Sequence, residues 1–376
     1  MKATALSLML ALWCVTGCRS DPYQATFTDN VGEAFEPCNS AEIKFLASKH
    51  NFMTAFANCG SNNFSNFGWS PSGRHLFFQL THSSHIMDAD AANKQTLTIP
   101  TSTPVGDGGW LSNSQVAVPI ALPDDPRIAI AVYDMEQSSV FSHPVDDVSA
   151  ISELQRGASK TQVLFSGTGD GETRHIYRMD LDTGDVKPAF AWLTAPIDTF
   201  TFTAALNRLV VGTKNTVTLY DSETGQALDT WSPAYRGTLH PDGSWLALEH
   251  LGEPISIFYQ RAWDELPEPA RRRELAKAER LEASLPDGYP KKIQPPILSF
   301  VEMDSGKRWQ MNNVQGETFQ WYEAKNYYGS FIVWGFEHKQ VNRNVVLGNF
   351  FDRFRNLKRG DNVTGVSAFE VTQQQP

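Results

Sequence analysis

The feature that most constrains this sequence is an internal repeat with a period of about 40 to 46 residues. In each copy an apolar stretch typical of a β-strand runs into a turn that begins with an acidic residue. The last interval between copies is about twice the period, so one unit is longer than the others. Repetition on this scale predicts a series of small units that pack against their neighbours. The first acidic residues of five copies are Asp88, Asp134, Asp180, Asp221 and Glu302.

A second repeated element precedes the acidic turn and consists of two apolar strands joined by a tight turn. Its clearest copies are Ser-Pro-Ser-Gly-Arg at 70–74 and His-Pro-Asp-Gly-Ser at 240–244. Proline followed by a polar residue and glycine is the pattern of a β-turn. Because each unit has several short strands with no helical pattern between them, the sequence predicts an all-β fold of radially repeated antiparallel sheets.

Together these two elements resemble the SPDG-type repeats of TolB-like, WD-related β-propellers. The segment from Tyr177 to Gly184 is similar to the third strand of that repeat and the turn after it. The resemblance spans residues 61 to 360. It implies a six-bladed β-propeller, with seven blades as the alternative, which we place at residues 61–376. Folds of this superfamily carry many functions, so the resemblance implies an architecture rather than an activity.

One repeat unit is predicted to hold a helical insertion between residues 263 and 296. Pro269 suits the first turn of a helix, and Pro-Asp-Gly at 286–288 is a stop signal. The apolar positions form a stripe that is too narrow for a core helix. We therefore expect an arm that extends from the propeller. The stripe comprises Leu275, Ala278, Leu281 and Leu285.

The N-terminal segment carries the features of an export signal. Lys2 precedes an apolar stretch at 3–15, which is too short to span a bilayer as a helix. The stretch ends in Val-Thr-Gly-Cys at 15–18, which resembles the bacterial lipobox. The resemblance implies a lipoprotein signal peptide at 1–17, cleavage before Cys18, and acylation of that residue with chains such as palmitate. An ordinary secretory peptide or a buried first helix is the alternative.

The residue after the lipidation site carries a further implication. It is Arg19 rather than Asp. By resemblance to enterobacterial sorting, this favours the outer membrane over retention at the inner one. We expect the propeller to be lipid-anchored there and to face the periplasm.

Two further cysteines, Cys38 and Cys59, form an even pair in an oxidising compartment, which favours a disulfide. A helix between them would hold the sulfur atoms about 30 Å apart, so we predict a hairpin stapled by this bond. With the lipid anchor and a linker it makes up residues 18–60. Free thiols are the alternative, and the pair lacks the C-x-x-C spacing of a redox or metal site. The hairpin could cap the ring, close it as a shared strand, or join a seventh blade.

The sequence offers no motif for catalysis or for a cofactor. The acidic turns lack the ligand loop of an EF-hand, so we interpret them as Asx-type turns. His82 and His85 beside Asp88 lack further metal ligands. The glycine-rich segments 106–109 and 168–171 lack the lysine of a phosphate loop and are interpreted as turns. We therefore predict no enzyme, no cofactor and no metal, although a channel site built from scattered residues would leave no motif.

Charge indicates the kind of partner. The chain has 32 basic and 42 acidic residues, a formal net charge of −10, which argues against nucleic acid. Two basic segments stand out, and we predict that they bind an acidic protein or anionic headgroups, a solvated surface being the alternative. Their candidate residues are Arg271, Arg272, Arg273, Arg353, Arg355, Lys358 and Arg359.

These features together predict a protein-binding or scaffold module of the bacterial cell envelope. A rigid propeller on a lipid tether presents a wide face of loops to a protein partner and needs no catalytic group. The alternative is a channel-site enzyme or a propeller that binds a small ligand or a glycan. The sequence does not indicate the partner or the oligomeric state.

Overall fold

The computed structural model describes most of the chain from Asn66 to Met311 and several strands outside it. The described residues are 44–46, 53–57, 66–72, 74–80, 83–88, 96–99, 103–169, 171, 173–259, 263, 266–288, 291–322, 328–337, 340–348 and 368–371.

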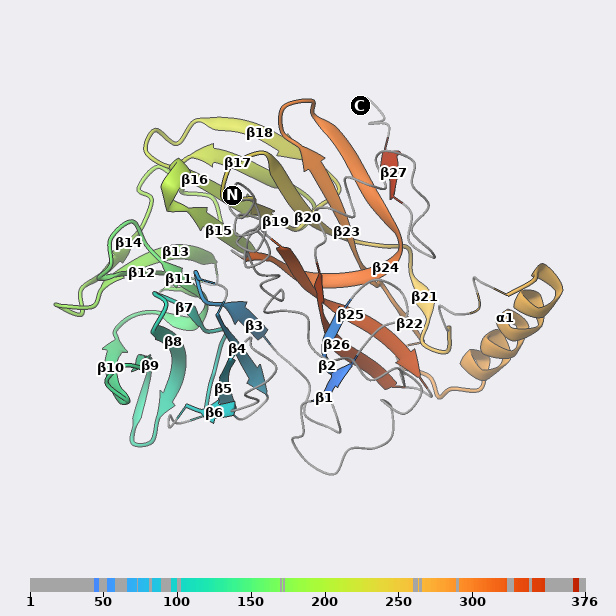
Figure 1. Ribbon diagram of the computed structural model, residues 1–376, viewed down its shortest axis with the longest axis horizontal. Helices are drawn as coiled ribbons and strands as arrows, with labels where there is room; N and C mark the ends of the chain where they lie inside the picture. The colour runs from blue at the N-terminus through green and yellow to red at the C-terminus, as the bar shows by residue number, and fades with distance from the viewer. Residues whose placement is uncertain are drawn as a thin grey trace, which may run out of the picture.

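Five antiparallel sheets follow one another along the chain and surround a common centre, which is the arrangement of a β-propeller (Figure 1). Strand order within each sheet follows chain order, as in a meander. The predicted all-β propeller is therefore confirmed in outline, with five blades detected. The first blade consists of β3 (Asn66–Trp69), β4 (His75–Leu80), β5 (Ser83–Asp88) and β6 (Thr96–Thr98), and the second of β7 (Gly109–Trp110), β8 (Gln115–Leu122), β9 (Asp125–Asp134) and β10 (Ser139–Val145). The third blade consists of β11 (Ser149–Arg156), β12 (Gln162–Thr168), β13 (Arg174–Asp180) and β14 (Val186–Pro188), and the fourth of β15 (Thr199–Thr203), β16 (Arg208–Gly212), β17 (Val217–Asp221) and β18 (Ala227–Trp231). The fifth blade consists of β19 (Arg236–Leu239), β20 (Trp245–Leu251), β23 (Pro296–Glu302) and the first part of β24 (Lys307–Tyr322).

The long strand β24 joins the fifth blade to a further sheet. Its first part pairs with β23 and with β27 (Ala368–Val371), and its second part pairs with β25 (Tyr328–Glu337). The sheet continues through β26 (Gln340–Gly348) to β2 (Met53–Ala57) and β1 (Lys44–Leu46). The hairpin β1–β2 thus adds its strands to a sheet from the C-terminal part of the chain.

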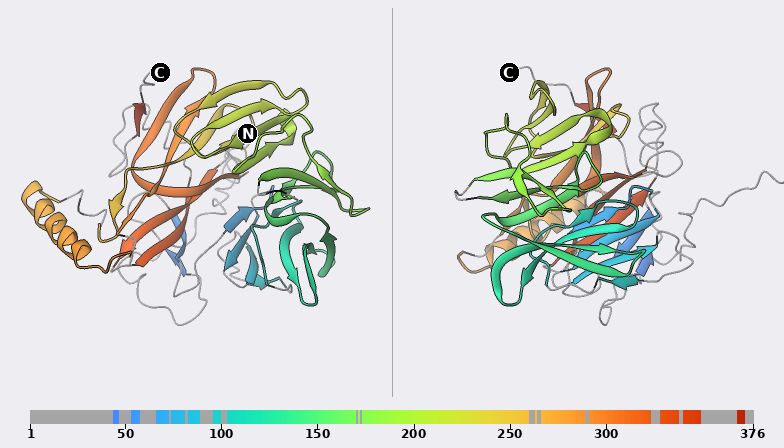
Figure 2. Two further views of the ribbon diagram at one scale, coloured as in Figure 1. Left: turned by 180° about the vertical axis from the view of Figure 1, so that it is seen from behind. Right: turned by 90° about the vertical axis from the view of Figure 1, so that its left-hand side faces the viewer.

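The first strand of each blade lies nearest the centre, and these strands contact one another in sequence. β3 contacts β7, β7 contacts β11, β11 contacts β15, and β15 contacts β19. β24 contacts both β19 and β3, so the series of contacts returns to its start. The rear view in Figure 2 shows the same ring of sheets, with the helix outside it.

The hydrophobic cores lie between neighbouring blades. Phe165 of β12 belongs to the cluster shared with the second blade, while the adjacent Leu164 belongs to the cluster shared with the fourth. Successive side chains of a strand point to opposite faces, so one strand contributes to two cores. This explains why the middle strands are apolar at consecutive positions, as in Leu209, Val210 and Val211.

The predicted insertion forms an arm on the fifth blade, which we define as residues 255–293. β21 (Ile255–Ser256) pairs with β22 (Lys292–Ile293), and between them lies α1 (Glu268–Ala283). Pro269 lies in the first turn, where its missing N–H has no partner to lose. Figure 1 shows α1 outside the ring of sheets. None of the helices in the described part of the chain combines the length and apolarity needed to cross a membrane.

Close approach of two innermost strands makes Gly109→Ala a specific probe of the ring. A Cβ atom at position 109 would collide with the carbonyl oxygen of Leu154 on the next blade. We expect this substitution to lower the free energy of unfolding by about 1–3 kcal/mol, measured by urea denaturation. Gly171→Ala is the matched control, because the nearest atom to its Cβ would be Thr173 Oγ1 at 3.8 Å. Equal effects of the two substitutions would contradict the packing described here.

Candidate functional site

The centre of the ring contains a cavity of about 430 Å³. Its wall is formed by β3, β7, β11, β15 and β19 and the segments next to them. Three of its lining residues are charged and several are aromatic, so the cavity combines polar and apolar surface, as small-molecule sites do. The charged residues are Asp107, Glu153 and Arg236, and the large aromatic ones are Phe67, Trp69, Trp110, Phe200 and Phe202.

Side-chain hydrogen bonds join the innermost strands of neighbouring blades at several junctions around the cavity. Asn66 Nδ2 donates to Gly108 O at 2.6 Å, and Trp110 Nε1 donates to Gly68 O at 2.7 Å. Gln155 bridges to the next blade by accepting from Phe202 N at 2.8 Å and donating to Phe200 O at 3.3 Å. These bonds satisfy backbone groups that the inner edge of a sheet would otherwise leave unpaired.

Hydrogen bonds from side chains to the backbone of the next blade also connect the fourth and fifth blades. Thr199 Oγ1 donates to Tyr235 O and Thr201 Oγ1 donates to Gly237 O, both at 2.8 Å. Because the donors are side chains of β15 and the acceptors are backbone atoms at β19, both strands are held in register with each other.

Two irregularities in β11 turn Glu153 toward the cavity. The register with β12 shifts between Ser149 and Ser152 and again between Ser152 and Gln155. Ala150 and Glu153 lie at these shifts with φ of 50° and 56°, in the left-handed region that residues other than glycine rarely adopt. Bulges of this kind re-aim side chains and are frequent beside functional sites.

The carboxyl group of Glu153 lies in an environment that disfavours its charge. Burial raises its pKa from 4.5 to about 7, Asp107 adds to the increase, and Arg236 and Arg174 oppose it. Its Oε2 atom is buried and has no hydrogen-bond partner among the described residues. Burial also raises the pKa of Asp107. The cavity therefore holds two carboxyl groups that would gain from a donor or a cation.

Arg236 supplies the positive charge of the cavity. Its Nε lies 3.8 Å from Oε1 of Glu249, whose side chain is only 3% exposed. Burial lowers the pKa of Arg236, but Glu249, Glu153 and Asp107 outweigh it and keep the pKa above its ordinary value. Nε is buried without a hydrogen-bond partner within the described part of the chain. The guanidinium is thus charged and lies against the Glu249 carboxylate.

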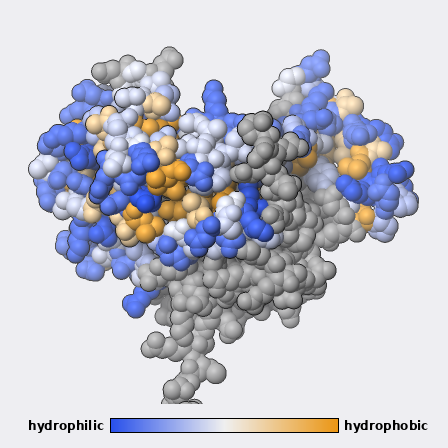
Figure 3. All heavy atoms as spheres, turned by 90° about the horizontal axis from the view of Figure 1, so that it is seen from above, coloured by the Kyte–Doolittle hydropathy of each residue, from blue (hydrophilic) through white to orange (hydrophobic). Residues whose placement is uncertain are grey.

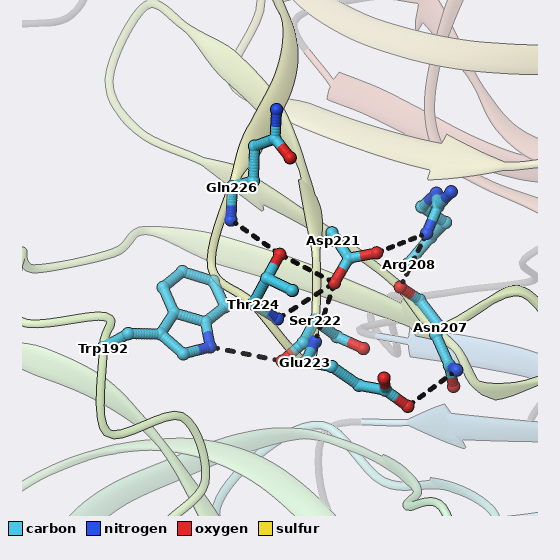
Figure 4. Close-up of polar contacts among 8 residues, drawn as sticks. All are labelled: Trp192, Asn207, Arg208, Asp221, Ser222, Glu223, Thr224 and Gln226. Carbon is cyan, nitrogen blue, oxygen red and sulfur yellow. Dashed lines mark hydrogen bonds and ion pairs between the residues drawn. The ribbon is translucent and has the colours of Figure 1, made fainter.

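Three of the five repeated acidic turns have the Asx-type hydrogen bonds that the sequence predicted. Asp221 Oδ1 accepts hydrogen bonds from the backbone N–H groups of Glu223 and Thr224 and from Thr224 Oγ1, and Oδ2 accepts from Arg208 (Figure 4). These hydrogen bonds lower the pKa of Asp221, and the bonds from Thr224 have the largest effect. Asp134 and Asp180 accept the same two backbone bonds from their own turns. The carboxylates are therefore used to shape Asx-type turns.

Of the candidate partner-binding residues, Arg271, Arg272 and Arg273 lie on α1. Arg272 Nε lies 2.7 Å from Glu268 Oε1, and its side chain is 76% exposed. Arg273 is exposed, and its Nε donates to Pro269 O at 3.3 Å. None of the three lines the cavity. Cys18, Cys38, Cys59, Arg353, Arg355, Lys358 and Arg359 lie outside the described residues, so those predictions stay predictions.

The cavity residues were not found by sequence analysis. Asp107, Glu153 and Arg236 come from three blades and form no motif. The segment 106–109, which was interpreted as a turn, instead leads into the innermost strand β7 beside the cavity. Its glycines were the available signal, because close backbone approach requires them. Within the described ranges no group of three His, Cys, Asp or Glu residues could hold a metal ion.

Comparison with known proteins gives similarities of fold. No family model matches the sequence, and no curated protein matches it. A putative TolB from Agrobacterium tumefaciens is 12% identical with a TM-score of 0.47, over 66% of this chain and 80% of that one. Kuenenia stuttgartiensis hydrazine synthase is 14% identical with a TM-score of 0.44, over 72% and 76%. Oligogalacturonate lyase from Vibrio parahaemolyticus is 8% identical with a TM-score of 0.45, over 76% and 78%.

The raised pKa of Glu153 predicts a specific pH dependence. The folded state holds this proton more tightly than the unfolded state, so stability falls as pH rises from about 4.5 to about 7. Glu153→Gln removes that contribution. We expect the variant to gain stability relative to wild type between pH 5 and pH 7.5, measured by urea denaturation at both values. Asp182→Asn, on an exposed turn, should show no such change. A pH-independent difference for Glu153→Gln would refute the assignment.

Proposed function

We propose that the protein is a scaffold module of the bacterial cell envelope that binds a protein partner through its arm. The observation that carries this proposal is the position of α1, which lies outside the ring of sheets (Figure 1). The four hydrophobic clusters described between the blades contain no residue of the arm. Binding is the role that best accounts for a helix in this position.

The surface of α1 suits a polar interface with an apolar element. Ala278 is its buried residue, while Leu281 is 40% exposed. The view from above shows the side of the molecule that carries α1 as mostly hydrophilic with a few hydrophobic residues (Figure 3). A helix of this length is marginally stable in water by itself, so a partner that packs against it would also stabilise it.

The three arginines favour an acidic partner. They lie in the second turn of α1, where the helix dipole gives no advantage to a cation. Glu268 offsets one of them through its ion pair with Arg272. In a chain with a formal net charge of −10, this run is a local positive surface. Arg353, Arg355, Lys358 and Arg359 are proposed to contact the same acidic partner on the basis of their charge alone.

The cellular location of the protein is part of the proposal. A signal peptide at 1–17, lipid on Cys18 and Arg19 after it would anchor the propeller at the outer membrane, facing the periplasm. A Cys38–Cys59 disulfide would staple the hairpin whose strands β1 and β2 pair with each other. The sheet of β25, β26, β2 and β1 would be the sixth blade, which is supported by the contact of β24 with β3. In this role the protein needs neither catalysis nor a cofactor.

In-cell crosslinking followed by detergent extraction and pull-down tests this function. We expect the wild-type protein to capture a discrete envelope protein, and Arg272→Glu with Arg273→Glu to reduce the captured amount several-fold. Lys187→Glu is the matched control, because this lysine lies on β14 and its side chain is 63% exposed. The control should capture as much partner as wild type.

A deletion of the arm separates binding from folding. Residues 258–290 would be replaced by a short Gly-Ser linker, which leaves β21 paired with β22. We expect an unchanged melting temperature and loss of the crosslinked partner. Undiminished capture by the deletion variant, or no stoichiometric partner for wild type, would contradict the proposal.

A further inference from the structure

We propose that the central cavity binds a small zwitterion, an α-amino acid, whose ammonium group contacts Glu153 and Asp107 and whose carboxylate contacts Arg236. This site is separate from the arm and does not depend on the scaffold function. The volume of about 430 Å³ is within the range of small-ligand pockets and exceeds what one amino acid requires.

The acidic side of the cavity calls for a cation. Asp107 and Glu153 both line the cavity, and Oε2 of Glu153 is buried with no hydrogen-bond partner in the described part of the protein. A buried acceptor without a hydrogen bond destabilises the protein, so a ligand that donates a hydrogen bond to this carboxyl group binds favourably. An ammonium group offers three donors and a full charge, which suits a cavity lined by two carboxyl groups that interact electrostatically with each other.

The basic side of the cavity calls for an anion. Arg236 lines the cavity, and its Nε atom is buried without a hydrogen-bond partner among the described residues, 3.8 Å from Oε1 of Glu249. Arg174 reinforces the positive potential that acts on both Asp107 and Glu153, and its Nη1 donates to Ser152 Oγ at 3.1 Å. A carboxylate matches the fork of donors on a guanidinium.

The remaining wall suits an apolar side chain. Trp69 and Phe202 line the cavity, and Trp110 lies there with its Nε1 already bonded to Gly68 O. The indole N–H of Trp110 is satisfied, and its ring stacks on His75 with centroids 6.1 Å apart, so Trp110 forms a fixed part of the apolar wall. The ligand class is therefore a neutral α-amino acid, in which the two charged groups meet the charged side chains and the side chain meets the aromatic ones.

Calorimetric titration of the full mature chain in detergent tests this inference without any substitution. l-Leucine is the probe, together with 3-methylbutylamine, which lacks its carboxylate, and 4-methylpentanoate, which lacks its ammonium group. We expect saturable binding of l-leucine and at least about tenfold weaker binding of each analogue, because each loses one charge-assisted contact. Equal affinity for all three, or no binding by a panel of neutral amino acids, would overturn it.

Two substitutions test which residue contacts the ammonium group of the ligand and which contacts its carboxylate. Glu153→Gln should weaken l-leucine and 3-methylbutylamine but not 4-methylpentanoate, and Arg236→Gln should weaken l-leucine and 4-methylpentanoate but not the amine. Asp185→Asn with Lys187→Gln, an exposed pair on the third blade, is the control and should leave l-leucine affinity unchanged. Circular dichroism melts confirm that each variant is folded. Loss of all three ligands in both variants would contradict the assigned contacts. Because α1 is intact throughout, failure here leaves the scaffold proposal standing.

Discussion

The hydrogen bonds from side chains of one innermost strand to the backbone of the next are the interaction on which the rest of the structure depends. A strand at the inner edge of a blade has no neighbouring strand on one side, so its backbone groups need other partners. Gln155 takes the place of such a strand by accepting from Phe202 N and donating to Phe200 O. Asn66 and Thr201 do the same at their own junctions. At these three junctions the inner edges of neighbouring blades satisfy each other.

That wall determines where charge can be placed. Once the edges are bonded to each other, the positions that face the cavity are free to carry other groups, and Glu153 and Arg236 occupy two of them. The irregular backbone of β11 brings Glu153 inward at a cost in local strain. The hydrophobic cores between blades, such as the one around Phe165, supply the stability that offsets this cost.

Much of the architecture could be predicted from the sequence, because it depends on residues that are close together in the chain. The turn at Asp180 can be recognised since the aspartate, the threonine and the glycine that form it are adjacent in the chain, and Gly184 has φ of 78°. The helix was recognisable for a similar reason, since Pro269 and the stop at 286–288 are its own signals. The number of blades was not settled by pattern, because β24 serves two sheets.

The site could not be predicted, because its residues meet only through the closed ring. Asp107, Glu153 and Arg236 belong to three blades, and only the glycines around Asp107 give a local signal of close backbone approach. The bulges that turn Glu153 inward depend on its pairing with β12 rather than on residue type. β2 pairs with β26, which comes from the opposite end of the chain. Because sequence patterns do not reveal a pairing of this kind, three placements of the hairpin stayed open.

In this structure the ring holds the charged groups of the cavity apart from each other. A high-resolution crystal structure of the mature protein, grown without added amino acids, is the decisive test. We expect Arg236 to lie against Glu249 and Oε2 of Glu153 to have no protein partner, with solvent or a small bound molecule between Arg236 and Glu153. A direct ion pair between Arg236 and Glu153, in a channel filled by side chains, would contradict it.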